Sequence, residues 1–189
     1  MTNDSHERYV NTLGLRSIAG RFLWTAAWQL LFRTSPRPCF GWRRFLLRCF
    51  GARLAATANI YPSVSVWAPW NLRMAADTCL ADGVDCYCVA DIVLEEGATV
   101  SQRAFLCTAS HDIHDRRRPL VAEPIRLEAD SWVFAEAFVG PGVTVRRGAV
   151  VAARAVVVRD VEECAIVAGN PGRVIGKRSA HALPHDPLC

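Results

Sequence analysis

The chain has 189 residues, of which 51% are apolar and 21% are charged. This composition excludes a wholly disordered chain and is typical of one folded domain with a substantial core. The net charge of +4 is unevenly spread, because residues 8–76 hold ten arginines and no acidic residue. The first 15 residues are polar and show no signal-peptide pattern. We therefore expect a cytoplasmic protein with a basic N-terminal third.

Two short amphipathic helices are predicted in this basic part, which we assign to residues 1–55. Residues 22–32 are mostly apolar, but they are too few to cross a bilayer, which needs about 20 residues. Pro36 and Pro38 end the first helix. In the second segment, apolar residues recur on one helical face, and arginines occupy the rest of the circumference: Trp42, Phe45, Leu46, Cys49 and Phe50.

Two interpretations of these helices stay open. In one, they cover the end of the following domain and leave the arginines in solvent. In the other, residues 17–53 contact an anionic membrane surface, which would attach the protein peripherally to the inner face of the cytoplasmic membrane. We do not expect nucleic-acid binding, because the aromatic residues lie on the apolar stripe.

Eight cysteines are present, without a CxxC pair and mostly within apolar runs. A secreted disulfide scaffold is normally shorter and richer in cysteine. We expect reduced thiols that act as small apolar side chains.

An internal period of six residues runs through the rest of the chain. It predicts a three-sided coil with six residues per side, in which one aliphatic side chain per side points inward. The same step occurs over 60–72, 74–86 and 94–106, with a two-residue slip after Leu72, and a β-sandwich is the alternative. About five coils are expected, roughly 24 Å tall at ~4.8 Å per coil. The clearest run is Leu127, Val133, Val139, Val145, Val151 and Val157, each followed four positions later by a small or β-branched residue.

The period fails between Leu106 and Leu127, where we expect a protruding loop over residues 109–124. Such a long insert in a regular solenoid is usually functional. It holds two histidines, and a histidine can take a proton from a hydroxyl near neutral pH. We predict His111 as a general base and assign His114 and Asp112 to substrate binding. The alternative is a solvated surface loop.

Several segments resemble the hexapeptide-repeat acetyltransferases. Leu106-Cys-Thr-Ala-Ser-His-Asp112 resembles the L-C-T-x-x-H-D segment of colanic acid biosynthesis acetyltransferases, which are close to the maltose, galactoside and nodulation O-acetyltransferases. Pro69-Trp-Asn-Leu72, Val100-Ser-Gln102 and Ala165-Ile-Val-Ala-Gly-Asn-Pro171 match the same group. The resemblance implies an all-β fold, a left-handed parallel β-helix over 56–178, with the helical extension before it and a tail over 179–189.

The resemblance also implies an acetyl-CoA-dependent O-acetyltransferase without a metal. The acceptor would be a sugar of a surface polysaccharide or its lipid-linked precursor, and the active form a homotrimer with active sites between subunits. Cys88 stands after Tyr87 where relatives carry Asn, so we expect Asp85 and Tyr87 to contact the acceptor, with Trp132 nearby. The implied CoA contacts are Ala135, Ala153, Val158, Arg159, Gly169, Asn170, Pro171, Arg173 and Lys177.

Three other functions are weighed against this one. A zinc lyase of the γ-carbonic-anhydrase type needs three histidine ligands, and the repeat region has two histidines. A non-catalytic solenoid used for assembly would not need the histidine-bearing loop. A xenobiotic or small-molecule acetyltransferase of the same fold remains the alternative within the transferase class, although a soluble acceptor gives no reason for the basic, apolar N-terminus.

Overall fold

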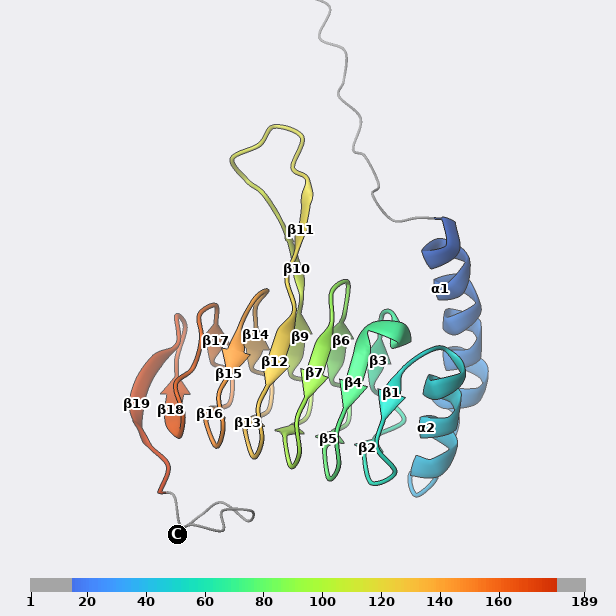
Figure 1. Cartoon of the computed structure of the whole chain (residues 1–189), viewed down its shortest axis with the longest axis horizontal. Coiled ribbons are helices and arrows are strands. Elements are labelled where there is room, and N and C mark those ends of the chain that lie inside the picture. Colours follow the sequence, from blue (N-terminus) through green and yellow to red (C-terminus); the bar gives the residue numbers. More distant parts are fainter. Residues whose placement is uncertain (1–14, 180–189) are drawn as a thin grey trace, which may run out of the picture.

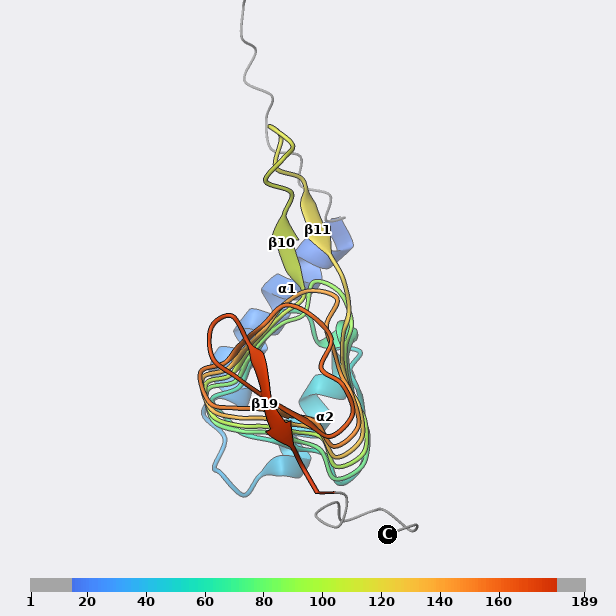
Figure 2. The same cartoon turned by 90° about the vertical axis from the view of Figure 1, so that its left-hand side faces the viewer.

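The computed structural model describes residues 15–179, and a three-sided prism of stacked coils occupies most of them (Figures 1 and 2). Figure 2 looks along the stack and shows the cross-section that the coils share. The first strand starts at Arg53, before the boundary expected at residue 56. Residues 1–14 and nearly all of the tail expected over 179–189 lie outside the described residues.

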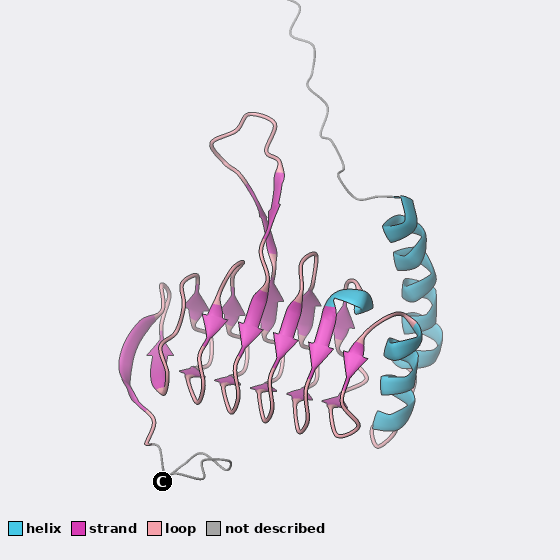
Figure 3. Cartoon of the chain, in the orientation of Figure 1, coloured by secondary structure: helices cyan, strands magenta, loops and turns pink. Residues whose placement is uncertain are grey.

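Each face of the prism is a sheet that takes a short strand from each coil (Figure 3). Neighbouring strands in the prism pair in parallel, apart from β18 and β19, which pair antiparallel. The first face holds β1 (Arg53–Leu54), β4 (Leu72–Met74), β7 (Ile92–Leu94), β12 (Ile125–Leu127) and β15 (Thr144–Val145). The second face holds β2 (Asn59–Ile60), β5 (Cys79–Leu80), β8 (Thr99–Val100), β13 (Trp132–Val133), β16 (Val150–Val151), β18 (Ala165–Ala168) and β19 (Arg173–Lys177). The third face holds β3 (Ser65–Val66), β6 (Asp85–Tyr87), β9 (Phe105–Cys107), β14 (Phe138–Val139) and β17 (Val156–Val157).

The six-residue repeat forms the core of this prism, as predicted. Five complete coils are followed by a sixth that contributes β18, against the expectation of about five. The two-residue slip has a simple cause. The strand β4 is three residues long, so Leu72 and Met74 both point inward from its two ends. The repeat residues are all buried: Leu127, Val133, Val139, Val145, Val151 and Val157, with the small residues Ala137, Val143, Ala149, Ala155 and Val161 packed among them.

Two helical segments lie across the N-terminal end of the prism, and we call residues 15–50 the helical cap (Figure 1). The helix α1 (Leu15–Ala27) continues into the π-helical turn η1 (Trp28–Phe32), and α2 (Phe40–Cys49) follows; a 3-10 turn, η2 (Pro69–Asn71), precedes β4. The inner side of the cap buries Trp24, Phe32 and Leu47 against the first coil. Among the described residues, none of the helices has the length and apolar character needed to cross a membrane.

The cap supplies hydrogen-bond donors to the open edge of the first coil. In a parallel stack, every second carbonyl of the edge strand points away from its neighbour and needs another partner. Cap side chains donate to five such carbonyls: Arg48 to Leu54 (2.8 Å), Arg44 to Ala58 (2.8 Å), Arg43 to Ile60 (2.5 Å), Trp28 to Val64 (2.7 Å) and Trp24 to Val66 (2.6 Å). The helices therefore cover the end of the prism, as the first of the two interpretations predicts, but that interpretation is wrong in leaving the arginines in solvent, because Arg43 is fully buried.

Arg43 is the central residue of this cap and is fully buried. Besides the Ile60 carbonyl, its guanidinium donates to Ser35 Oγ (2.9 Å) and to the carbonyls of Pro36 (2.8 Å) and Arg37 (2.6 Å). All of these partners are neutral, and burial lowers the pKa of Arg43 from its ordinary value. The charge is thus held by backbone dipoles and not by a contacting carboxylate.

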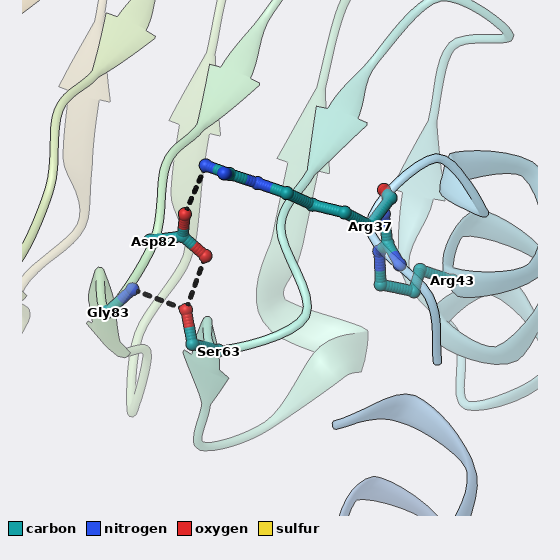
Figure 4. Close-up of polar contacts among 5 residues, drawn as sticks. All are labelled: Arg37, Arg43, Ser63, Asp82 and Gly83. Atoms are coloured by element: carbon teal, nitrogen blue, oxygen red, sulfur yellow. Dashed lines mark hydrogen bonds and ion pairs between the residues drawn. The ribbon is translucent and has the colours of Figure 1, made fainter. Parts of the chain in front are cut away.

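A second set of contacts ties the link between α1 and α2 to the second coil (Figure 4). The Arg37 guanidinium lies 2.6 Å from one carboxylate oxygen of Asp82. The other oxygen accepts a hydrogen bond from the Ser63 hydroxyl (2.8 Å), which in turn accepts one from the Gly83 N–H (2.8 Å). The Arg37 side chain is largely exposed, so we expect this ion pair to orient the link more than to stabilise it.

Candidate active site

The break in the repeat forms a β-hairpin of β10 (Ala109–His111) and β11 (Leu120–Ala122), which stands off the prism between the third and first faces (Figure 1). Thr108 holds its base together. The Thr108 carbonyl accepts the N–H of Glu123 (2.9 Å), and its buried hydroxyl donates to the Tyr87 carbonyl (2.8 Å). The loop predicted over 109–124 is therefore an ordered hairpin rooted on the third face.

His111 is the last residue of β10 and pairs with Leu120 across the hairpin. Its Nδ1 lies 2.7 Å from the carbonyl oxygen of Arg118. Because a carbonyl can only accept a hydrogen bond, Nδ1 carries the proton in the neutral ring and Nε2 is the basic nitrogen. The hairpin backbone thus selects the tautomer that a general base acting through Nε2 requires, on a side chain that is exposed.

The other loop residues predicted to bind substrate lie beyond His111, toward the hairpin tip. One carboxylate oxygen of Asp112 accepts the N–H of His114 (2.8 Å), and Asp115 makes the same kind of turn with the N–H of Arg117 (2.8 Å). Such turns stabilise the loop backbone. Asp112 therefore shapes the tip, and the His114 side chain is exposed there.

The predicted acceptor residues Asp85 and Tyr87 lie on β6, next to the strand from which the hairpin rises. Tyr87 pairs with Cys107 of β9, and its ring packs between Trp67 (5.6 Å between centroids) and Phe105 (6.5 Å). Burial raises the pKa of Asp85, and a hydrogen bond with Ser65 opposes that rise. Tyr87 therefore lies at the root of the hairpin that carries His111, and Asp85 lies two residues earlier on the same strand.

The cysteines near this root act as core residues. Cys88 points inward, with Sγ 3.2 Å from both the nitrogen and the oxygen of Ala68, and burial raises its pKa to about 11. Burial also raises the pKa of Cys86 well above its ordinary value. Cys107 is buried and directs its Sγ to the Ala109 carbonyl (3.1 Å). Cys88 therefore does not take the place of a polar acceptor contact.

Trp132, which was expected near the acceptor or the pantetheine, lies on a different face. Its strand β13 belongs to the second face, whereas the hairpin rises between the third and first faces. The indole N–H donates to Ser101 Oγ (2.9 Å), and the ring stacks on Phe134 at 4.6 Å between centroids. One chain alone therefore does not place Trp132 beside His111.

A pocket of about 650 Å³ opens at the C-terminal end of the prism, between the last coil and β19. Four of the positions expected to contact CoA line it, namely Val158, Arg159, Pro171 and Arg173. Its other lining residues are mostly valines: Val156, Val157, Val161, Val167 and Val174, with Asp160 and Gly172. The pocket thus combines an apolar floor with two guanidinium groups.

The remaining expected CoA contacts do not line this pocket. Ala135 and Ala153 lie in the turns between the second and third faces. They occupy the same corner of the prism in two neighbouring coils. Gly169 and Asn170 belong to the turn between β18 and β19, where the Gly169 carbonyl accepts the N–H of Val156 (2.9 Å). Lys177 ends β19, opposite Ala165.

Within residues 15–179, no group of three or more His, Cys, Asp or Glu side chains is placed to hold a metal ion.

The sequence match decides the family. Over 156 residues, the chain is 36% identical to the Escherichia coli K12 protein named as a colanic acid biosynthesis acetyltransferase, WcaF, a match that covers 82% of this chain and 86% of that protein. The chain belongs to the hexapeptide-repeat acetyltransferases.

Solved structures have the same fold as this acetyltransferase. A maltose O-acetyltransferase from Clostridium difficile 630 superposes with a TM-score of 0.79 at 20% identity, covering 88% of this chain and 90% of that one. A hexapeptide-repeat acetyltransferase from Vibrio cholerae, solved with acetyl-CoA, superposes with a TM-score of 0.77 at 24% identity, covering 90% and 93%. No model of a protein family matches the chain.

Two residues of this acetyltransferase matter for the site but were not expected to. Thr108 anchors the hairpin through contacts of its backbone and hydroxyl, and its place in the L-C-T segment was the available signal. Gly172 donates its N–H to the Val156 carbonyl (2.8 Å), and a Cβ there would lie 2.9 Å from Val167 Cγ1 and 3.0 Å from Val156 O. A side chain at Gly172 would therefore push the turn away from the pocket.

Proposed function

We propose that this protein transfers the acetyl group of acetyl-CoA to a hydroxyl of a sugar in surface-polysaccharide biosynthesis. The relative WcaF is named for the biosynthesis of colanic acid. The observation that carries the proposal is the contact between His111 Nδ1 and the Arg118 carbonyl, because it leaves Nε2 as the base that this chemistry needs. Asp85 and Tyr87 on β6, with Asp112 and His114 toward the hairpin tip, would contact the acceptor.

The transfer is direct. Nε2 of His111 takes the proton of the acceptor hydroxyl while the acceptor oxygen attacks the thioester carbonyl carbon. The tetrahedral oxyanion then collapses, the carbon–sulfur bond breaks, and the departing sulfur receives the proton from the imidazolium. The products are an acetyl ester and CoA thiol. A cysteine acyl carrier is not needed, and the raised pKa of Cys86 and Cys88 keeps these thiols protonated near neutral pH.

The pocket at the C-terminal end would hold part of the CoA. Its valine floor suits an apolar segment of the molecule, and Arg159 and Arg173 suit the phosphates. Lys177 would contact a part of the CoA that extends beyond the pocket, toward the far end of β19. Pro171 lines the pocket, and Gly169 and Asn170 would contact CoA from the turn that precedes it. Ala135 and Ala153 would contact the pantetheine arm, since small side chains at that corner allow an extended chain to lie close to the backbone.

The active form in this proposal is a homotrimer with its sites between subunits. The hairpin stands off its own prism and His111 is exposed, so a neighbouring subunit would supply the opposite wall of the site (Figure 1). Trp132 would then approach His111 from that neighbour. We place the enzyme in the cytoplasm, since the described cysteines are free thiols. The acceptor would be a sugar or a lipid-linked sugar.

The test is release of CoA thiol from acetyl-CoA in the presence of free, nucleotide-linked and lipid-linked sugars. We expect release that depends on one class of acceptor and yields an acetylated sugar by mass spectrometry. A panel of xenobiotic acceptors serves as the comparison. Release with those compounds alone would replace the polysaccharide assignment, and absence of both release and CoA binding would contradict the enzymatic one.

Gly172→Ala tests the CoA pocket. The added Cβ would meet Val167 and the Val156 carbonyl, so the turn carrying Pro171 and Arg173 has to move outward. We expect CoA affinity, measured by calorimetry, to fall about tenfold, which corresponds to roughly 1.4 kcal/mol. The matched control is Gly176→Ala on β19, where a Cβ would have no atom within 4 Å. Equal affinity in both variants would place the CoA elsewhere.

A further inference from the structure

The outer side of the helical cap, facing away from the prism, is apolar and exposed. Phe22 is 76% exposed, Leu30 is 71% exposed and Phe45 is 55% exposed, although the inner side of the same helices already buries Trp24, Phe32 and Leu47 in the core. The helices are thus apolar on two sides, and one side has no partner within the described chain. We call this surface the outer cap face; its large exposed residues are Ile18, Phe22, Leu23, Leu30, Leu31, Trp42 and Phe45.

The outer cap face is continuous across both helical segments. The indole N–H of Trp42 on α2 donates to the carbonyl of Leu31 at the end of η1 (3.0 Å), which joins the two helices at the surface. The Trp42 ring stacks on Phe45 with 5.8 Å between centroids. A continuous exposed apolar surface on a folded domain marks an interaction site.

The net charge of the helical cap is positive. Arg44 and Arg48 donate to neutral carbonyls of the first coil, and these contacts do not neutralise their charge. Among the described residues up to 76, ion pairs with carboxylates are formed only by Arg37 and Arg73. No acidic residue occurs between positions 8 and 76.

We propose that the outer cap face docks on an anionic lipid membrane. The helices would lie in the plane of the interface, with Phe22, Leu30 and Phe45 in the boundary of the acyl chains, and the net positive charge of the cap would attract the anionic headgroups. A second copy of this chain fits the face less well, because pairing two caps would bring two net positive charges together. Charge complementarity therefore favours the lipid surface.

Docking in this way would hold the prism upright on the membrane. The strand β9 is two coils above the first coil, about 10 Å at ~4.8 Å per coil, and the cap adds roughly one helix diameter of ~10 Å. The root of the hairpin would therefore lie about 20 Å above the docked face. If the proposed function holds, that position suits a lipid-linked sugar acceptor; the docking itself does not depend on it.

The experiment is cosedimentation of the full chain with vesicles of phosphatidylcholine alone or with phosphatidylglycerol added. We expect binding to the anionic vesicles at low salt, at least tenfold weaker binding to the neutral ones, and weakening as salt screens the arginines. The triple variant Phe22→Ser/Leu30→Ser/Phe45→Ser should bind the anionic vesicles at least about tenfold more weakly, because burial of even one of these side chains contributes roughly that factor. Its melting temperature should stay near that of wild type, since the three residues are exposed.

Ile175→Ser is the matched control, because Ile175 is 68% exposed but lies on β19 at the opposite end of the prism. It should bind vesicles as wild type does. Absence of vesicle binding at low salt, or equal binding by the triple variant, would overturn the proposal. So would concentration-dependent self-association by sedimentation velocity that the triple variant abolishes, because a second copy would then cover the face. Each of these outcomes is independent of acetyl transfer.

Discussion

His111→Ala is expected to lower kcat for acceptor-dependent thiol release by about 10²–10⁴-fold, the usual contribution of a positioned general base. The exposed imidazole lies at the end of β10, so its removal should leave the hairpin pairing and the prism intact. CoA affinity should stay within about twofold of wild type, since the proposed CoA pocket lies at the C-terminal end of the prism. Initial rates and calorimetry with CoA measure the two quantities separately.

The control for this variant is Cys107→Ala, four residues earlier at the hairpin base. Cys107 directs its Sγ to the Ala109 carbonyl, and direct transfer assigns it no chemical role. We expect the folded Cys107→Ala protein to keep most of its activity. If it loses all activity while binding CoA normally, an acyl-cysteine route would replace direct transfer. If His111→Ala turns over like wild type, the base is another residue.

Arg43→Met is expected to be the most destabilising single substitution in the helical cap. It removes the guanidinium but keeps a long apolar side chain, so four acceptors lose their donor: the Ile60, Pro36 and Arg37 carbonyls and the Ser35 hydroxyl. A buried polar group without a partner costs about 1–3 kcal/mol, and we expect a total loss of ~3 kcal/mol or more after relaxation. For a chain of this length, that loss lowers the melting temperature by roughly 6–12 °C.

Arg48→Met provides the comparison on the same helix. The Arg48 guanidinium also donates to a carbonyl of the first coil, that of Leu54, but at an exposed position where water can take its place. We expect a loss below about 1 kcal/mol. Thermal unfolding followed by circular dichroism measures both variants. Equal effects at the two positions would mean that the burial of Arg43 contributes nothing to the stability of the cap.

Much of this fold was predictable because its core is local in sequence. Strands of two or three residues separated by turns of constant length place every sixth side chain inward. The spacing of Leu127, Val133 and Val139 therefore predicts the prism without knowledge of any distant contact. The hairpin was predictable because the six-residue period stops there. An insert that breaks such a period cannot remain in the coil. Its histidines and the L-C-T-x-x-H-D segment then indicated the chemistry and the family.

The cap was not predictable to the same degree. An arginine beside an apolar helical stripe looks the same whether it lies in solvent or donates to an edge carbonyl. Arg43 meets Ile60, and Trp24 meets Val66, only because the first coil turns its unpaired carbonyls toward the helices. The sequence showed that the N-terminal third is basic and amphipathic, but packing decided which side of each helix is buried and which side forms the outer cap face.

The chemistry of the site divides in the same way. The sequence by itself determined that a histidine in a protruding segment is available as a base and that arginines gather near the C-terminal coil. Only the tertiary structure decided that Nδ1 of His111 faces the Arg118 carbonyl, and that Trp132 lies on another face of the same chain. Every residue type carries a backbone carbonyl, so the sequence does not show which carbonyl a side chain will contact. The face on which a residue lies depends on the turns between coils.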